Sequence, residues 1–136
     1  MPTNAEIIAK IFSTADQKFG LRLFSQTEIN RLTFSQDGDK TLMFCPISGK
    51  KKVAKPEEIV RQLMIDRLHY QLGYALNQMA VEVAIKMGST YASKKADIVV
   101  YREPSKQNIH IIVECKKPSR SDGFCEFQTS SQYCWT

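Results

Sequence analysis

Two runs of β-branched residues in the second half of the chain constrain its fold more than any other sequence feature. Ala96–Tyr101 and His110–Lys116 are continuous, largely apolar runs, which are typical of strands covered on both faces. The loop between them, Arg102–Asn108, is short enough to join antiparallel neighbours. A third strand is predicted at Val81–Lys86, where Val81, Val83 and Ile85 alternate with Glu82, Ala84 and Lys86.

A helix is predicted directly before these strands. Pro56 suits the first helical position, Glu57 and Glu58 suit the positive end of the helix dipole, and Gly73 suits the end of the helix. Apolar residues at helical spacing predict one buried stripe of Val60, Leu63, Met64, Leu68 and Leu72. This order of elements predicts an α/β fold in which helices pack on a small mixed sheet with an antiparallel β-meander.

The first 54 residues are expected to add a helix and a hairpin. Thr3 and Glu6 have capping-box spacing before a helix predicted at 4–18. Segments 31–34 and 41–45 flank Asp37-Gly38, which suits a tight turn. After Pro118 no period is evident. We therefore expect one domain over 1–136, with the helix and hairpin in 1–54, the core in 55–118 and an irregular or truncated tail in 119–136, as part of a longer polypeptide.

Composition and charge narrow the class of protein. The chain has 136 residues and a formal net charge of +5, and a basic surplus favours polyanionic partners without specifying one. No apolar run approaches the roughly 20 residues that span a bilayer, and no signal peptide is evident, so a cytoplasmic protein without membrane contact is expected. The four cysteines form no C-x-x-C pair, which favours reduced structural thiols over a zinc site.

The candidate chemistry lies in Asp97 and in Glu114-Cys115-Lys116. Side chains alternate along a strand, so Glu114 and Lys116 share a face, and antiparallel pairing can bring Asp97 beside them. Two carboxylates, with the Cys115 backbone carbonyl, suit Mg²⁺, which prefers oxygen ligands. Lys116 would position a water or offset charge on a phosphate. The trio therefore predicts phosphodiester hydrolysis, whereas the alternative is a set of surface ion pairs.

Other charged residues leave two interpretations open. Glu82 is either a metal ligand or a salt-bridge partner of a cation on its own strand face, and the latter is favoured. Glu58 and Arg61 are one helical turn apart, which by itself indicates a surface pair. Basic residues flank both motifs, namely Lys94, Lys95, Lys117 and Arg120. These four are expected to contact DNA phosphates, although a solvated charged rim would have the same composition.

Four segments, 55–66, 72–74, 95–101 and 111–118, together resemble the N-terminal nuclease domain of type I restriction enzyme R subunits, in the family's order and spacing. The resemblance implies a restriction-endonuclease-like PD-(D/E)xK fold and a Mg²⁺-dependent endonuclease, with Mn²⁺ as a substitute, that cuts double-stranded DNA. By motif it assigns Asp97, Glu114 and Lys116 to the catalytic trio and Glu58 to the accessory acidic residue. The implied partners are modification and specificity subunits.

Two alternatives remain beside this type I site-specific deoxyribonuclease. One is a non-catalytic DNA-binding or docking module on a decayed nuclease fold, and the other is a PD-(D/E)xK nuclease outside type I systems. The sequence contains no G-x-x-x-x-G-K-[ST] phosphate loop. ATP is therefore expected to act only through a motor region absent from this chain.

Overall fold

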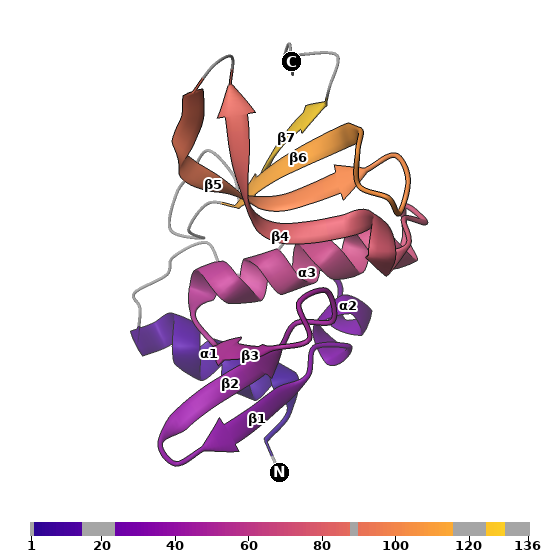
Figure 1. The fold of residues 1–136 in the computed structure, drawn as a ribbon. Coiled ribbons are helices and arrows are strands. Elements are labelled where there is room, and N and C mark those ends of the chain that lie inside the picture. Colours follow the sequence, from indigo (N-terminus) through magenta and orange to yellow (C-terminus); the bar gives the residue numbers. More distant parts are fainter. Residues whose placement is uncertain (1, 15–23, 88–89, 116–124, 130–136) are drawn as a thin grey trace.

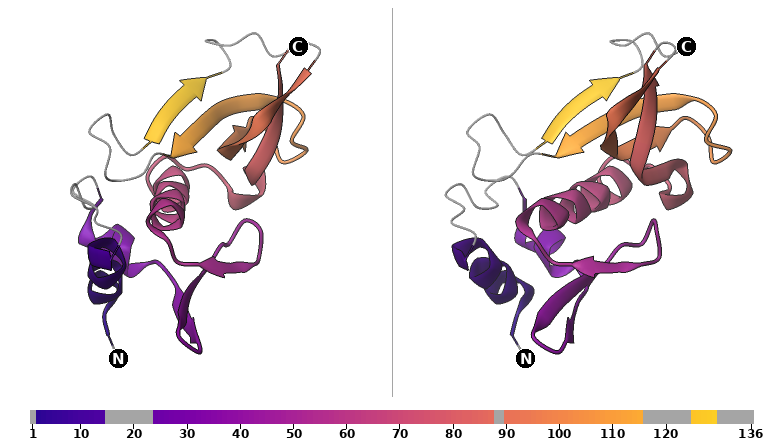
Figure 2. Two further views of the ribbon diagram at one scale, coloured as in Figure 1. Left: turned by 90° about the vertical axis from the view of Figure 1, so that its left-hand side faces the viewer. Right: turned by 60° about the vertical axis from the view of Figure 1, so that its left-hand side comes forward.

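A single long helix, α3 (Pro56–Tyr70), lies between two sheets in the computed structural model, which describes residues 2–14, 24–87, 90–115 and 125–129 (Figure 1). The smaller sheet has the order β1-β2-β3, formed by Phe34–Asp37, Lys40–Phe44 and Lys51–Val53. The larger sheet has the order β4-β5-β6-β7, formed by Met79–Met87, Thr90–Tyr101, Ile109–Cys115 and Cys125–Thr129. The side views show the same arrangement (Figure 2).

Two further helices and one short turn complete the described elements. Helices α1 (Asn4–Thr14) and α2 (Gln26–Asn30) contact each other and α3. The 3₁₀ turn η1 (Leu76–Gln78) leads from α3 into β4. None of the helices in the described ranges is long and apolar enough to cross a membrane.

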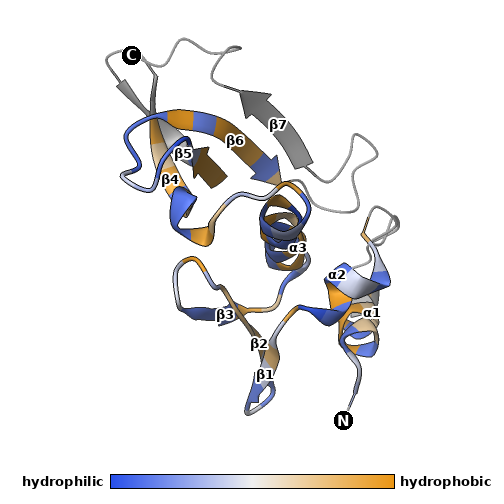
Figure 3. Ribbon diagram, turned by 90° about the vertical axis from the view of Figure 1, so that its right-hand side faces the viewer, coloured by the Kyte–Doolittle hydropathy of each residue, from blue (hydrophilic) through white to orange (hydrophobic). Residues whose placement is uncertain are grey.

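Helix α3 is buried around most of its circumference because it is covered from two sides. Figure 3 shows hydrophobic segments on both sides of it, in β6 and in β2. The predicted stripe is buried from Val60 to Leu68, but Ile59, Gln62 and Ile65 are buried as well. Leu72 was wrongly included: it is 56% exposed, because the helix ends at Tyr70. Gly73 follows with a φ of +80°, a conformation that favours glycine.

The larger sheet is antiparallel throughout its described strands, so the expectation of a mixed sheet was wrong. The predicted meander itself is confirmed. Parallel neighbours would need a crossover connection, usually a helix. Here α3 precedes all four strands, and no helix is described between them.

The tail after residue 118 was expected to be irregular, but it contributes β7, which pairs with β6. The pattern Cys-Glu-Phe-Gln-Thr at 125–129 does alternate, yet five residues are too few for a periodicity argument to be decisive.

Two details of the N-terminal half also differ from expectation. The S-x-x-E signature at Ser25–Glu28 forms a capping box that starts α2, a helix that sequence analysis missed. Because Arg31 caps α2, the first hairpin strand begins at Phe34 and not at residue 31. Helix α1 begins at Asn4 as predicted and is described to Thr14, while residues 15–18 of the prediction lie outside the described ranges.

Candidate active site

Three acidic residues occupy one row across the larger sheet. The pairs Val81–Ile98 and Val83–Ala96 in β4 and β5 flank the position at which Glu82 faces Asp97. The register of β5 and β6 ends one position short of the pair Asp97–Glu114. We call Glu82, Asp97 and Glu114 the acid row.

The row continues into the fourth strand. Glu114 is paired with Glu126 of β7, although the Glu126 side chain lies outside the described part of the chain. Continued by one position, the register of β5 and β6 would set Asp97 opposite Glu114. The proximity of their side chains stays a prediction, because Glu114 alternates with Val113 and Cys115, which pack in the core beside α3. The sheet register also adds Glu82 and the Glu126 position, which sequence analysis did not place there.

The β4–β5 pair changes face at the acid row. Val81 packs in the large core beside α3, whereas Val83 and Ile85 pack in a second cluster on the other side. The prediction that these three residues share one face was therefore wrong. The cause is Glu82, whose φ of +54° lies in the left-handed region and breaks the alternation. Such backbone strain persists only where the surroundings enforce it.

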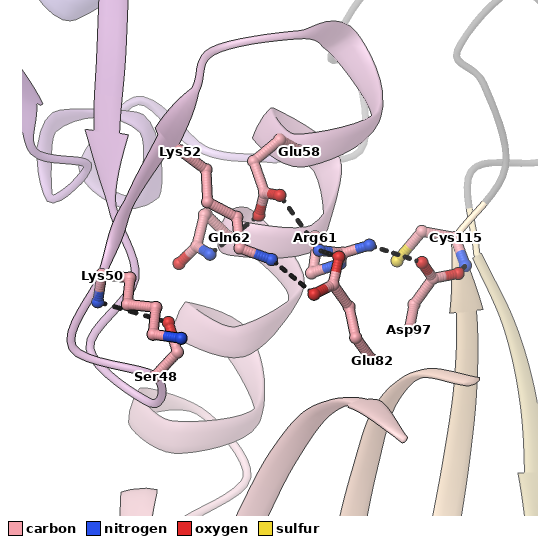
Figure 4. Close-up of polar contacts among 9 residues, drawn as sticks. All are labelled: Ser48, Lys50, Lys52, Glu58, Arg61, Gln62, Glu82, Asp97 and Cys115. Atoms are coloured by element: carbon pink, nitrogen blue, oxygen red, sulfur yellow. Dashed lines mark hydrogen bonds and ion pairs between the residues drawn. The ribbon is translucent and has the colours of Figure 1, made fainter. Parts of the chain in front are cut away.

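Arg61 on α3 joins the acid row to the helix (Figure 4). Its Nη2 donates to Asp97 Oδ1 at 2.8 Å, and its Nη1 donates to Glu58 Oε1 at 3.0 Å and to Glu82 Oε1 at 3.4 Å. The Arg61 side chain is only 12% exposed. Its Nε is buried and has no hydrogen-bond partner in the structure. One guanidinium therefore serves three carboxylates and still keeps one unsatisfied donor.

The outer residues of this network are also fixed. Gln62 donates to Glu58 Oε2 at 3.0 Å, and Lys52 of β3 pairs with Glu82 at 2.7 Å. The Cys115 backbone N–H donates to Asp97 Oδ2 at 2.8 Å, so both oxygens of Asp97 are held. Glu82 is thus a salt-bridge partner of cations on β3 and α3, while the side chain of the cation on its own strand, Lys86, lies outside the described part of the chain.

The electrostatics follow from these contacts. Burial disfavours the charged form of Arg61, but hydrogen bonding to Asp97 and the charges of Glu58, Asp97 and Glu82 outweigh it and raise the Arg61 pKa. The hydrogen bond from Lys52 lowers the pKa of Glu82 against a smaller effect of burial. Among the described side chains, three carboxylates thus face two cations, Arg61 and Lys52.

The residues of the row have the chemistry that a hard divalent cation requires. Carboxylate and carbonyl oxygens are its preferred ligands. Within the described ranges, no group of three Asp, Glu, His or Cys side chains is arranged to hold a metal ion. Arg61 lies between Glu58 and Asp97 and takes up the oxygens that face α3.

Several predicted site residues fall outside the described side chains. Lys116, Lys117 and Arg120 are not described, and Lys94 is described only as part of β5. Lys95 is exposed on β5. Sequence analysis missed Gln62 and Lys52 and treated Arg61 only as the partner of Glu58. The i,i+3 spacing of Glu58 and Arg61 was visible, but their burial depends on the sheet that covers α3.

Comparison with known proteins gives one match. A family model described as "type I restriction enzyme R protein N terminus" matches residues 56–136, which is more than half of the chain. No curated protein and no solved structure matches. The matched region includes α3, the acid row and Arg61.

Proposed function

Because the chain belongs to the family of type I restriction enzyme R protein N termini, we propose that it is the Mg²⁺-dependent endonuclease domain of such an R subunit, with a PD-(D/E)xK fold. The observation that supports the proposal is the acid row: the register of β5 and β6, continued by one position, would set Asp97 opposite Glu114, two positions before Lys116. The substrate would be double-stranded DNA, cut by hydrolysis of a phosphodiester bond.

In this proposal Asp97, Glu114 and the backbone carbonyl of Cys115 hold the Mg²⁺, or Mn²⁺ in its place. A divalent ion held there would supply a Lewis acid for the scissile phosphate and would lower the pKa of a bound water. The Cys115 N–H fixes the orientation of the Asp97 carboxylate through the 2.8 Å hydrogen bond. Lys116 offsets negative charge that develops on the phosphate. Glu58 acts as the accessory acid, with its carboxylate oriented by Gln62.

Basic residues around the row would hold the DNA backbone. Lys95 on β5 is exposed, and so are Lys50 and Lys51 beside the site-facing Lys52. Together with Lys94, Lys117 and Arg120 they would offset the repulsion between phosphates and carboxylates. Recognition of a DNA sequence and ATP-driven movement would belong to the partner subunits and to a motor region outside this chain.

A nicking assay tests the proposed activity. Supercoiled plasmid is incubated with Mg²⁺ or Mn²⁺ and the wild-type chain, Glu114→Gln, or the control Glu57→Gln, which changes an exposed acid of α3. We expect wild type and Glu57→Gln to nick the plasmid and Glu114→Gln to lose at least about a hundredfold in rate, an effect typical of losing a group that acts on the transition state. Equal rates for Glu114→Gln and wild type would exclude the assignment.

A non-catalytic DNA-binding module is the second candidate. The contacts of Arg61 favour it, because in this structure a guanidinium already offsets the charge of Asp97, Glu58 and Glu82. This candidate predicts DNA binding in gel-shift assays that neither Mg²⁺ nor Glu114→Gln changes, together with no nicking by any variant.

A further inference from the structure

The segment that forms β2 and β3 of the smaller sheet is strongly basic. Residues 40–55 contain five lysines and no acidic residue. Only Lys52 pairs with a described carboxylate, that of Glu82. The other four are exposed, namely Lys40, Lys50, Lys51 and Lys55. Within the described ranges no ion pair offsets their charge, so this side of the molecule attracts polyanions.

One face of these two strands is turned toward α3. Met43 of β2 is opposite Lys52 of β3 in the strand register. Met43 is buried in the large core, and Lys52 reaches Glu82 at 2.7 Å. The residues that alternate with these two therefore lie on the other face of the sheet.

The other face carries apolar side chains next to a lysine. Phe44 is opposite Lys51, and Leu42 is opposite Val53. Phe44 is 39% exposed and Val53 is 44% exposed, and neither they nor Leu42 pack in either core cluster. We call Leu42, Phe44, Lys51 and Val53 the outer patch. It combines an exposed aromatic ring, apolar neighbours and a free positive charge.

We propose that the outer patch binds single-stranded DNA, with Phe44 stacked on a base and the surrounding lysines on the phosphates. This inference rests on the proposed function only in taking DNA as the polyanion. It needs neither a divalent cation nor the acid row, since Lys51 and Lys52 point to opposite faces of β3.

The composition of the patch favours an unpaired strand over other partners. Lysine is depleted at protein–protein interfaces, whereas lysines beside an exposed aromatic ring are typical of surfaces that bind single strands. In a duplex the faces of the bases are covered by neighbouring base pairs, so the Phe44 ring could not stack on them. An unpaired strand offers both phosphates and free base faces.

A hollow beside Phe44 gives a stacked base additional room. It has a volume of about 270 Å³, and Phe44 lines it together with Thr33, Gln62 and His69. These three side chains carry hydrogen-bonding groups, and proteins recognise unpaired bases through hydrogen bonds to base edges combined with stacking on rings. Ring, hollow and lysines thus lie next to one another on the smaller sheet.

The first test measures fluorescence anisotropy of a labelled oligothymidylate of about 12 nucleotides, within the usual site size of a single domain. EDTA is present throughout. Phe44→Ala should bind about tenfold more weakly than wild type, equivalent to about 1.4 kcal/mol for one stacked base. The control Leu72→Ala changes an exposed apolar residue after α3 and should match wild type. Equal affinity of Phe44→Ala and wild type would overturn the proposal.

Two comparisons sharpen this test. Phe44→Leu keeps an apolar side chain without the ring, and wild-type affinity in this variant would overturn stacking. Phe44→Ala should leave the affinity for a duplex of the same length unchanged, because duplex binding uses only the lysines.

The second test addresses the phosphate contacts through their salt dependence. Lys51→Gln should reduce the slope of log affinity for oligothymidylate against log salt by about 0.7, the value for one phosphate contact on a single strand. The control Lys106→Gln removes an exposed lysine between β5 and β6 and should keep the wild-type slope. An unchanged slope in Lys51→Gln would contradict the assignment.

These results separate the inference from the proposed function. Oligothymidylate binding in EDTA by a protein that never nicks plasmid would uphold the outer patch and reject the nuclease. Nicking without oligothymidylate binding would do the reverse. Binding of labelled polyglutamate as tight as that of oligothymidylate would indicate a docking surface for acidic proteins and would overturn the proposal.

A measurement on wild type covers the case in which Phe44→Ala does not fold. The ring protons of Phe44 are assigned by their absence from aromatic ¹H–¹³C spectra of Phe44→Leu. They should move upfield when oligothymidylate is added, because a stacked base exerts a ring-current shift. Ring resonances that stay fixed at saturation would contradict the proposal.

Discussion

Two clusters of charged side chains contact α3, and they differ in how completely their donors are hydrogen-bonded. At one end Arg67 and Glu28 form a closed pair: both donors of the fork are used, the guanidinium stacks over Phe24 at 4.6 Å, and Ser25 donates its N–H to Glu28. At the other end Arg61 is shared among Asp97, Glu58 and Glu82 and retains an unsatisfied Nε.

This difference separates an ion pair that supports the fold from a cluster suited to a ligand. Charge is balanced one to one in the Arg67–Glu28 pair, and burial of Glu28 is compensated by hydrogen bonds from Arg67 and Ser25 that lower its pKa. The acid row keeps more carboxylates than cations and a strained residue, Glu82.

The largest effect is expected from Glu28→Gln. This change leaves the Arg67 guanidinium without its charged partner beside the core, which should lower the free energy of unfolding by about 3 kcal/mol. Urea denaturation followed by circular dichroism measures it. The control is Arg31→Gln, which breaks a partly exposed pair with Asp66 and should change the free energy of unfolding less than Glu28→Gln does. If Glu28→Gln lowered the free energy of unfolding by less than Arg31→Gln does, the contrast between the two clusters would be contradicted.

Asp97→Asn should change the free energy of unfolding by less than about 1 kcal/mol, because relief of repulsion between carboxylates offsets a weaker hydrogen bond to Arg61. The same urea experiment checks this value. A loss as large as that of Glu28→Gln would mean that the acid row is a structural cluster, and the comparison would fail.

The smallest effect is a pH dependence. Because the folded-state pKa of Glu28 lies below its ordinary value of 4.5, its carboxylate stabilises the fold fully above that pH. The contribution falls as the pH drops through the folded-state pKa. The difference in unfolding free energy between wild type and Glu28→Gln should therefore shrink below pH 4.5. A difference that stays constant down to about pH 3 would show that Glu28 does not titrate with folding.

Local pattern was enough to predict much of this fold. The proline and acidic residues at 56–58 fixed the start of α3, and β-branched runs identified the strands that became β5 and β6. These features depend on neighbouring residues, which a sequence displays directly. The short segment β7 and the five-residue helix α2 were missed because their patterns are too brief to stand out.

Several residues of the site could be predicted from the sequence, but the hydrogen bonds and ion pairs between them could not. The spacing of Asp97 and Glu114 suggested that they meet, and this stays a prediction, because the described register of β5 and β6 ends at Ile98 and Val113. The role of Arg61 could not be predicted, because it depends on hydrogen bonds to residues far away in the sequence. Asp97 lies 36 positions and Glu82 lies 21 positions after Arg61. Glu82 turns toward α3 because its φ lies in the left-handed region. Glycine usually marks that conformation in a sequence, but this position is a glutamate.

Binding of Mn²⁺ to wild type, Asp97→Asn and Asp39→Asn tests the metal site most directly. Asp39 lies exposed in the turn between β1 and β2 and serves as the matched control. The account predicts a saturable heat of Mn²⁺ binding for wild type and Asp39→Asn and its loss in Asp97→Asn. The same affinity in all three proteins would contradict a divalent cation at the acid row.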